Sequence, residues 1–97
     1  MKLYLVHCGY YDPEISEGVY EFHTNFFVVA NSALDAKNKS KALQQYQDRR
    51  MHVDGVQEIE IVDGYRINLT SEQALAGKTV VNSYKHNQLS VNPAPNA

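Results

Sequence analysis

Residues 22–30 read FHTNFFVVA, and this stretch is the centre of the predicted fold. Phe26 to Val29 are consecutive aromatic and β-branched residues, which favour a strand that is apolar on both faces. Ser32 follows as a typical helix N-cap, and Asp35 stands three residues later, at the spacing of a capping box. The sequence therefore predicts a buried strand followed directly by a helix.

The predicted helix runs from Ser32 to the pair Arg49–Arg50, which suits the negative end of the helix dipole. Its apolar residues recur at helical spacing and form one stripe: Ala33, Ala36, Leu43, Tyr46 and Met51. Upstream, residues 2–8 read KLYLVHC, a strand with apolar side chains on both faces. Leu3 and Leu5 share one face, and Tyr4, Val6 and Cys8 share the other, as in an inner strand.

Residues 56–69 predict a β-hairpin around Asp63–Gly64. A two-residue turn there would pair Ile61 with Arg66 and mix apolar with charged side chains. A three-residue loop, residues 62–64, would instead pair Ile61 with Tyr65 and keep one apolar face. We therefore predict the three-residue loop.

Together these elements predict an α+β fold, ββαββ, with a mainly antiparallel sheet of order 2-1-3-4 and one helix on one face. Residues 1–70 form the predicted core domain, and residues 92–97 a tail. Residues 71–91 form an appendage in which Lys78–Tyr84 is a candidate strand. Because one helix covers only one sheet face, the other face needs a C-terminal segment or a second subunit, and a homodimer is predicted.

Composition narrows the class of protein. The 97 residues carry a net charge of −2, so the overall charge does not indicate the basic surface that nucleic-acid binding requires. The single cysteine, Cys8, cannot form an internal disulfide, which suits the reducing cytoplasm. No apolar run approaches the roughly 18 residues of a membrane span.

Several segments in order resemble the bacterial domain-of-unknown-function family 1543 over residues 1–70. They are Met1–Leu3, Glu21–Thr24 leading into Phe27–Ala30, and His52–Asp54 followed by Val62–Arg66. Two departures stand out: Thr24 replaces an expected aspartate after the histidine, and no tryptophan occurs in or after the helix. The resemblance implies a small bacterial domain that occurs singly or in tandem, and it implies no activity.

His23, His52 and Asp54 are the candidate ligand-binding residues, because imidazole and carboxylate groups bind transition metals and polar small molecules. They would meet only if residues 52–54 extend the third strand under one particular sheet order. No C-x-x-C or H-E-x-x-H spacing occurs, so no metal, cofactor or catalytic residue is assigned. Cys8 is predicted to be a buried apolar residue, and His7 beside it points to the opposite face.

Tyr10, Tyr11 and Tyr20 lie in and beside a predicted long loop, residues 9–21, and tyrosine is common at recognition surfaces. The leading prediction is a non-enzymatic, self-associating or protein-interaction module that uses these tyrosines. One alternative is a small-molecule or metal-binding protein, with enzymes included, that uses His23, His52 and Asp54. Another alternative is a weak nucleic-acid binder.

Overall fold

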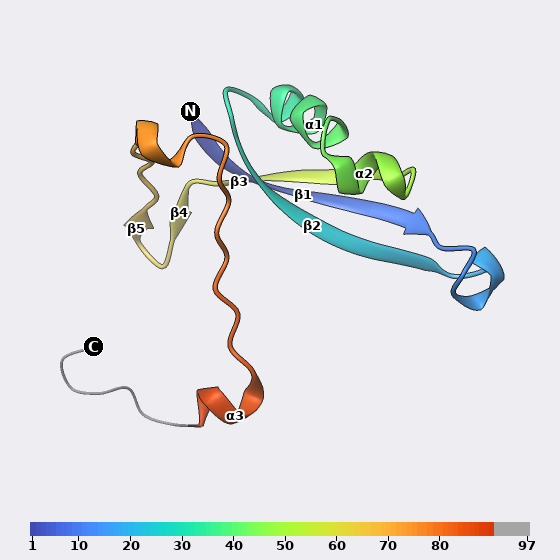
Figure 1. Cartoon of the computed structure of the whole chain (residues 1–97). Helices are drawn as coiled ribbons and strands as arrows, with labels where there is room; N and C mark the ends of the chain where they lie inside the picture. The colour runs from blue at the N-terminus through green and yellow to red at the C-terminus, as the bar shows by residue number, and fades with distance from the viewer. Residues whose placement is uncertain (91–97) are drawn as a thin grey trace.

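The computed structural model describes residues 1–90 (Figure 1). Three strands, β1 (Lys2–Tyr11), β2 (Glu21–Ala30) and β3 (His52–Ile59), form one sheet in the order β2-β1-β3. The central strand β1 is antiparallel to both neighbours. The α+β class, the antiparallel sheet and the first three positions of the predicted strand order are confirmed.

The central strand has two different faces, as its alternating sequence predicts. Tyr4, Val6 and Cys8 are buried, and they pack with Val28 and Ala30 of β2 to form the core. Leu3 and Leu5 point to the other face and are half-buried. β1 runs on to Tyr11, so the loop between β1 and β2 is shorter than predicted and holds one turn of 3-10 helix, η1 (Ser16–Gly18).

The helix α1 (Ala33–Lys41) begins where the sequence predicts. The Ser32 hydroxyl accepts a hydrogen bond from the backbone N–H of Asp35 at 3.1 Å, and the Asp35 carboxylate accepts one from the N–H of Asn31 at 3.0 Å. The first bond satisfies a backbone donor that the first helical turn leaves without a partner, and the second ties the residue before the N-cap to the helix. Ala36 is fully buried against the sheet, so α1 covers the face that carries Tyr4, Val6 and Cys8.

The prediction of one continuous helix is wrong, because α1 ends at Lys41 and a separate α2 (Gln44–Asp48) follows. Leu43 between them is extended, with φ −69° and ψ 137°. At 100° per residue, a straight helix would place Tyr46 about 80° away from the line of Ala36. The break lets both Tyr46 and Met51 reach the core that α1 already covers.

The predicted fourth strand of the sheet is also wrong. Residues 61–66 form a separate two-stranded hairpin, β4 (Ile61–Val62) and β5 (Tyr65–Arg66), which pairs Ile61 with Arg66. The turn has two residues, with positive φ at both Asp63 (50°) and Gly64 (81°), instead of the predicted three. Since Ile61 is 52% exposed and Tyr65 76% exposed, no buried face selects the register, and the Asp–Gly preference for a type I′ turn prevails.

The C-terminal segment leads away from the sheet, drawn in orange in Figure 1. It contains two short helices, η2 (Gln73–Leu75) and α3 (His86–Leu89). The candidate strand Lys78–Tyr84 is wrong, since those residues pair with no strand among residues 1–90, and a strand needs a partner edge. The predicted tail, residues 92–97, lies outside the described residues. Every helix within residues 1–90 is too short or too polar to cross a membrane.

Candidate functional site

The sheet face opposite α1, called here the open face, has an apolar half and a polar half. Strand pairing places Leu3 beside Val29 and Ile59, and Leu5 beside Phe27, in the apolar half. The polar half continues along β1 through His7 and Gly9 to Tyr11. The candidate ligand-binding residues lie in this polar half.

The strand register brings two histidines to one point of the polar half. His23 on β2 lies opposite Gly9 of β1, and His52 on β3 lies opposite the same glycine from the other side. Residues directly opposite each other point to the same face of an antiparallel sheet. The order β2-β1-β3 therefore sets two imidazoles on either side of a residue that has no side chain.

A β-bulge in β3 adds a carboxylate to the two histidines. Gly55 pairs with His7 and Val53 pairs with Cys8, which leaves Asp54 as the extra residue. A bulge shifts the alternation of the strand and can redirect a side chain. Here Asp54 reaches the open face on the same side as His52, while Val53 and Val56 both pack on the core.

The four polar side chains form a closed ring, called here the His-carboxylate ring, in which histidines and carboxylates alternate. Glu21 Oε1 lies 3.1 Å from His23 Nε2 and 3.0 Å from His52 Nε2. On the other side, Asp54 Oδ2 lies 3.4 Å from His23 Nε2, and its Oδ1 lies 3.1 Å from His52 Nε2. These side chains remain 31% to 48% exposed, so one side of the ring opens to solvent.

These separations fit the coordination shell of a divalent metal ion. Zinc lies about 2.0–2.2 Å from histidine nitrogens and carboxylate oxygens, so tetrahedral geometry places ligand atoms about 3.3–3.6 Å apart. The four contacts in the His-carboxylate ring run from 3.0 to 3.4 Å, and Asp54 offers a different oxygen to each histidine. Glu21, His52 and Asp54 each offer a ligand atom within 4.8 Å of the other two. The four contacts also suit hydrogen bonds from protonated histidines, so a metal ion would replace protons in an arrangement of nearly the right size.

Gly9 lies directly beneath the His-carboxylate ring, on the central strand β1. A Cβ atom at position 9 would meet the carboxylate of Glu21 and lie 2.7 Å from His52 Nε2 and 2.9 Å from Asp54 Oδ2. Such contacts are too short for any side chain. The space above Gly9 is therefore filled by the ligand atoms themselves, and a glycine inside a strand often marks such a close approach.

Two neighbours extend the site along β1. His7 stacks on His23 with ring centres 4.9 Å apart and planes within 7°. Its Nδ1 lies 2.7 Å from the side-chain oxygen of Asn25, a contact that suits the tautomer in which Nδ1 donates and Nε2 is the ligand atom. His7, His23 and Asp54 each offer a ligand atom within 4.8 Å of the others, so His7 is a further donor beside the ring.

The carboxylate of Glu21 is held in its charged form. Desolvation alone would raise the pKa of Glu21, but the hydrogen bond from His52 and the charges of His23 and His52 outweigh it and lower that pKa. The Tyr11 hydroxyl also donates to Glu21 Oε2 at 3.3 Å. The charge of Glu21, together with desolvation, raises the pKa of Tyr11, so this hydroxyl stays protonated as a donor. An ionised carboxylate is the form that binds a metal ion.

The structure brings the three predicted ligand residues, His23, His52 and Asp54, into one cluster. Glu21 and Gly9 were missed by the sequence reasoning. A signal for Gly9 exists, because a glycine between apolar strand residues predicts a close approach of other atoms. Cys8 is fully buried on the opposite face and takes no part, and desolvation, reinforced by the charge of Asp54, raises the pKa of its thiol.

The three predicted contact tyrosines do not share one surface. Tyr10 faces the helices, stacks on Phe22 at 5.8 Å and lies 5.0 Å below the Arg49 guanidinium. Tyr11 points to the open face toward Glu21. Tyr20 is 66% exposed in the β1–β2 loop.

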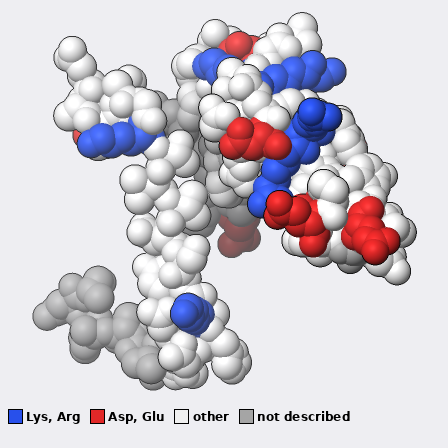
Figure 2. Space-filling model, turned by 45° about the vertical axis from the view of Figure 1, so that its right-hand side comes forward, with Lys and Arg blue, Asp and Glu red and all other residues white. Residues whose placement is uncertain are grey.

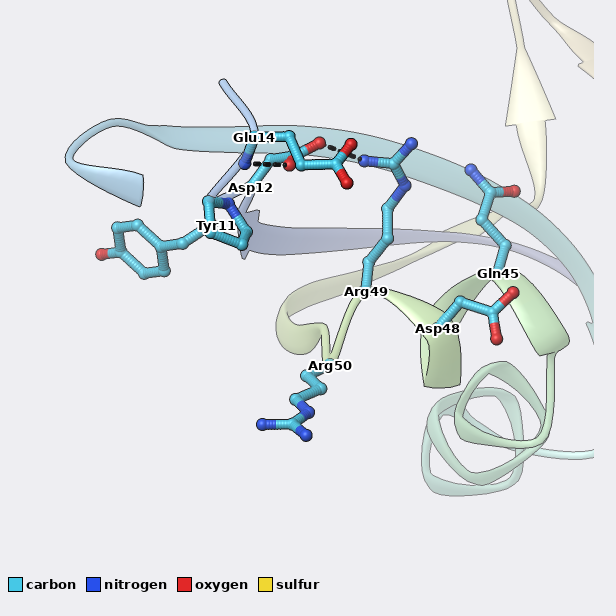
Figure 3. Close-up of a pocket in the computed structure, with 8 residues that line it drawn as sticks. Tyr11, Asp12, Glu14, Gln45, Asp48, Arg49 and Arg50 are labelled. Atoms are coloured by element: carbon cyan, nitrogen blue, oxygen red, sulfur yellow. Dashed lines mark hydrogen bonds and ion pairs between the residues drawn. The ribbon is translucent and has the colours of Figure 1, made fainter. Parts of the chain in front are cut away.

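A hollow lies between the β1–β2 loop and α2, away from the His-carboxylate ring (Figure 3). Arg49 crosses it and contacts Asp12 at 2.9 Å, while Arg50 points away. Because the charge of Arg49 is already paired and its guanidinium rests over Tyr10, this contact fastens the loop to α2. Figure 2 shows Lys and Arg intermingled with Asp and Glu on the face it displays, without a stripe of one charge.

The comparisons with known proteins identify a family. The family model of Domain of Unknown Function (DUF1543) matches residues 18–69, which is more than half of the chain. The match includes Glu21, His23, His52 and Asp54, whereas His7 and Gly9 lie before it. No curated protein and no solved structure matches the chain. The chain thus belongs to the Domain of Unknown Function (DUF1543) family.

Proposed function

We propose that this protein is a metal-binding domain that holds one divalent transition-metal ion on the polar half of its open face. The ligands are His23, His52, Asp54 and Glu21, with His7 as a further donor beside them. One observation carries the proposal: two histidines and two carboxylates alternate around a closed ring, with contacts of 3.0–3.4 Å, above a glycine that leaves room for them.

The donor set favours particular metals. Two imidazole nitrogens with two carboxylate oxygens suit zinc, iron, cobalt or manganese better than the all-oxygen shells of calcium and magnesium. Thiolate chemistry does not contribute, because Cys8 lies on the buried face. We therefore expect zinc or cobalt to bind at this site.

The ring is open on one side, which favours binding of an external ligand over a purely structural role. Structural zinc sites are closed by four protein ligands, whereas functional sites leave a position for water or substrate. Here the fold has its own core on the other side of the sheet, built around Val6 and Cys8. We expect the domain to stay folded without metal and the ion to accept a small anionic or polar ligand from solution.

Titration of the purified full chain with zinc and with cobalt tests this function. Wild-type protein is expected to bind one ion per chain by calorimetry, and bound cobalt should show the visible bands of a low-coordinate site. His23→Ala and His52→Ala should each weaken binding at least about 100-fold, through loss of a ligand and of its partners.

The fourth histidine supplies a matched control. His86 lies on α3 in the C-terminal segment, away from the sheet, and His86→Ala should bind metal like wild type. Equal losses in all three variants, or no binding by wild type, would reject the metal site.

The other expectations from the sequence remain proposals. Self-association is taken up below, on a different surface from the tyrosine loop. Bacterial origin and a cytoplasmic location stay predictions that rest on the family resemblance and on the single cysteine.

A further inference from the structure

The apolar half of the open face is only partly covered by the described residues: Leu3 and Ile59 line a small hollow with Ile67 and Leu69, whereas the β2 side is exposed. Phe27 is 52% exposed and Val29 42% exposed, although both belong to the most strongly apolar strand of the chain. With their cross-strand neighbours they form a patch, called here the apolar patch: Leu3, Leu5, Phe27, Val29 and Ile59. None of the five residues is charged. A contiguous apolar surface on a sheet face marks a place of contact.

The chain exposes more surface than a folded monomer of its size. Its accessible area is 8174 Å², whereas a compact protein of 11.0 kDa has about 5600 Å². Residues 68–90 are all exposed and account for part of this difference, and the open face adds to it through Phe27 and Val29. A stable dimer needs about 800 Å² from each partner, so a two-fold contact would bury these two side chains together with the half-buried Leu3, Leu5 and Ile59.

Beyond Leu69, the C-terminal segment of the same chain leaves Phe27 and Val29 of the apolar patch exposed. It leads away from the sheet in Figure 1, and its own apolar side chains stay in solvent, with Val80 78% and Val81 61% exposed. The Cα radius of gyration is 16.7 Å, against about 12.5 Å for a compact domain of this length. The C-terminal segment therefore does not cover the exposed β2 side of the patch.

We propose that the apolar patch binds the same patch of a second copy of this chain, in a two-fold symmetric, face-to-face sheet dimer. In a two-fold interface the same surface of both copies meets, so a charged residue within it would lie close to a residue of the same charge. This patch avoids such repulsion, because Glu21 and Asp54 lie in the polar half. Gly9 lies four positions after Leu5 along β1, which is about 13 Å, so the metal site of each copy falls outside the contact.

The oligomeric state of the full chain tests the proposal. Sedimentation equilibrium over a concentration series should give a mass of two chains for the wild-type protein. Phe27→Glu sets two charges against apolar surface and should raise the dissociation constant at least about 30-fold, as expected for a central interface residue. Leu34→Glu is the matched control, since Leu34 is 66% exposed on α1, on the opposite side of the sheet, and should leave the dimer unchanged.

Three further measurements make the outcome decisive. If circular dichroism shows that Phe27→Glu unfolds, the milder Phe27→Ser should weaken the dimer in a folded chain. Val80→Glu combined with Val81→Glu should dimerise like wild type, and dissociation would show that the C-terminal segment makes the contact instead. A chelator should leave the dimer intact, which separates this proposal from the metal site. A wild-type monomer at about 100 µM would overturn the proposal.

Discussion

Replacing Gly9 with alanine should separate metal binding from folding. The new Cβ would lie 2.7 Å from His52 Nε2 and 2.9 Å from Asp54 Oδ2, and it would also meet the Glu21 carboxylate. Ordinary contact requires about 3.4 Å, so each of these ligand atoms must retreat by roughly half an ångström or more. Metal–ligand bonds tolerate only about 0.2 Å, so the displaced ligands can no longer converge on one ion.

The expected loss is large in affinity and small in stability. Disturbing one supporting contact of a metal site costs about 10- to 100-fold, so displacing three ligands should weaken zinc binding at least about 100-fold. The clashing atoms are ends of half-exposed side chains that can swing into solvent. Alanine in a strand is more favourable than glycine by about 0.5–1 kcal/mol, so the metal-free variant should unfold at equal or slightly higher urea concentration.

Calorimetric titration with zinc and urea unfolding without metal measure the two effects separately. Gly55→Ala is the matched control, because it lies opposite His7 on β3 and a Cβ there would meet no atom within 4 Å. It should bind zinc like wild type. If Gly9→Ala also binds zinc like wild type, or if Gly55→Ala loses as much affinity, then metal binding does not depend on the absence of a side chain at position 9.

Three smaller predictions concern the fold. Ser32→Ala removes the acceptor of the Asp35 N–H bond and should lower the free energy of unfolding by about 1 kcal/mol, whereas Ser32→Asp should retain most of it. Val6→Ala, at a fully buried position, should cost about 2 kcal/mol in urea unfolding, from two lost methyl groups and the cavity they leave. The Cys8 thiol should react with a disulfide reagent at pH 8 far more slowly in the native protein than in urea, because burial raises its pKa and blocks access. Equal reaction rates in the native and urea-unfolded protein would contradict this burial. Since folding raises the pKa of the thiol, deprotonation favours the unfolded chain, and the free energy of unfolding should fall as pH rises through the ordinary thiol range.

Local patterns in the sequence were sufficient for the parts of the fold that depend on neighbouring residues. The alternation of Leu3 and Leu5 with Tyr4 and Val6 predicted both faces of β1, and Ser32 with Asp35 predicted the start of α1. These features follow from the two- and 3.6-residue periods and from capping chemistry, which act within a few residues of the chain. The residue types of His23, His52 and Asp54 likewise indicated possible ligands.

The site itself depended on tertiary structure. Glu21, His23, Gly9, His52 and Asp54 come from three strands, and only the pairing register sets two histidines across one glycine. The bulge at Asp54 depends on the same pairing, because an extra residue has meaning only against a partner strand. The hairpin at Asp63–Gly64 shows the converse: its apolar residues predicted a place in the sheet, but without a buried face the turn preference decided its register. Sequence periodicity determines which face a residue occupies, whereas contacts between distant strands determine which residues share that face at one point.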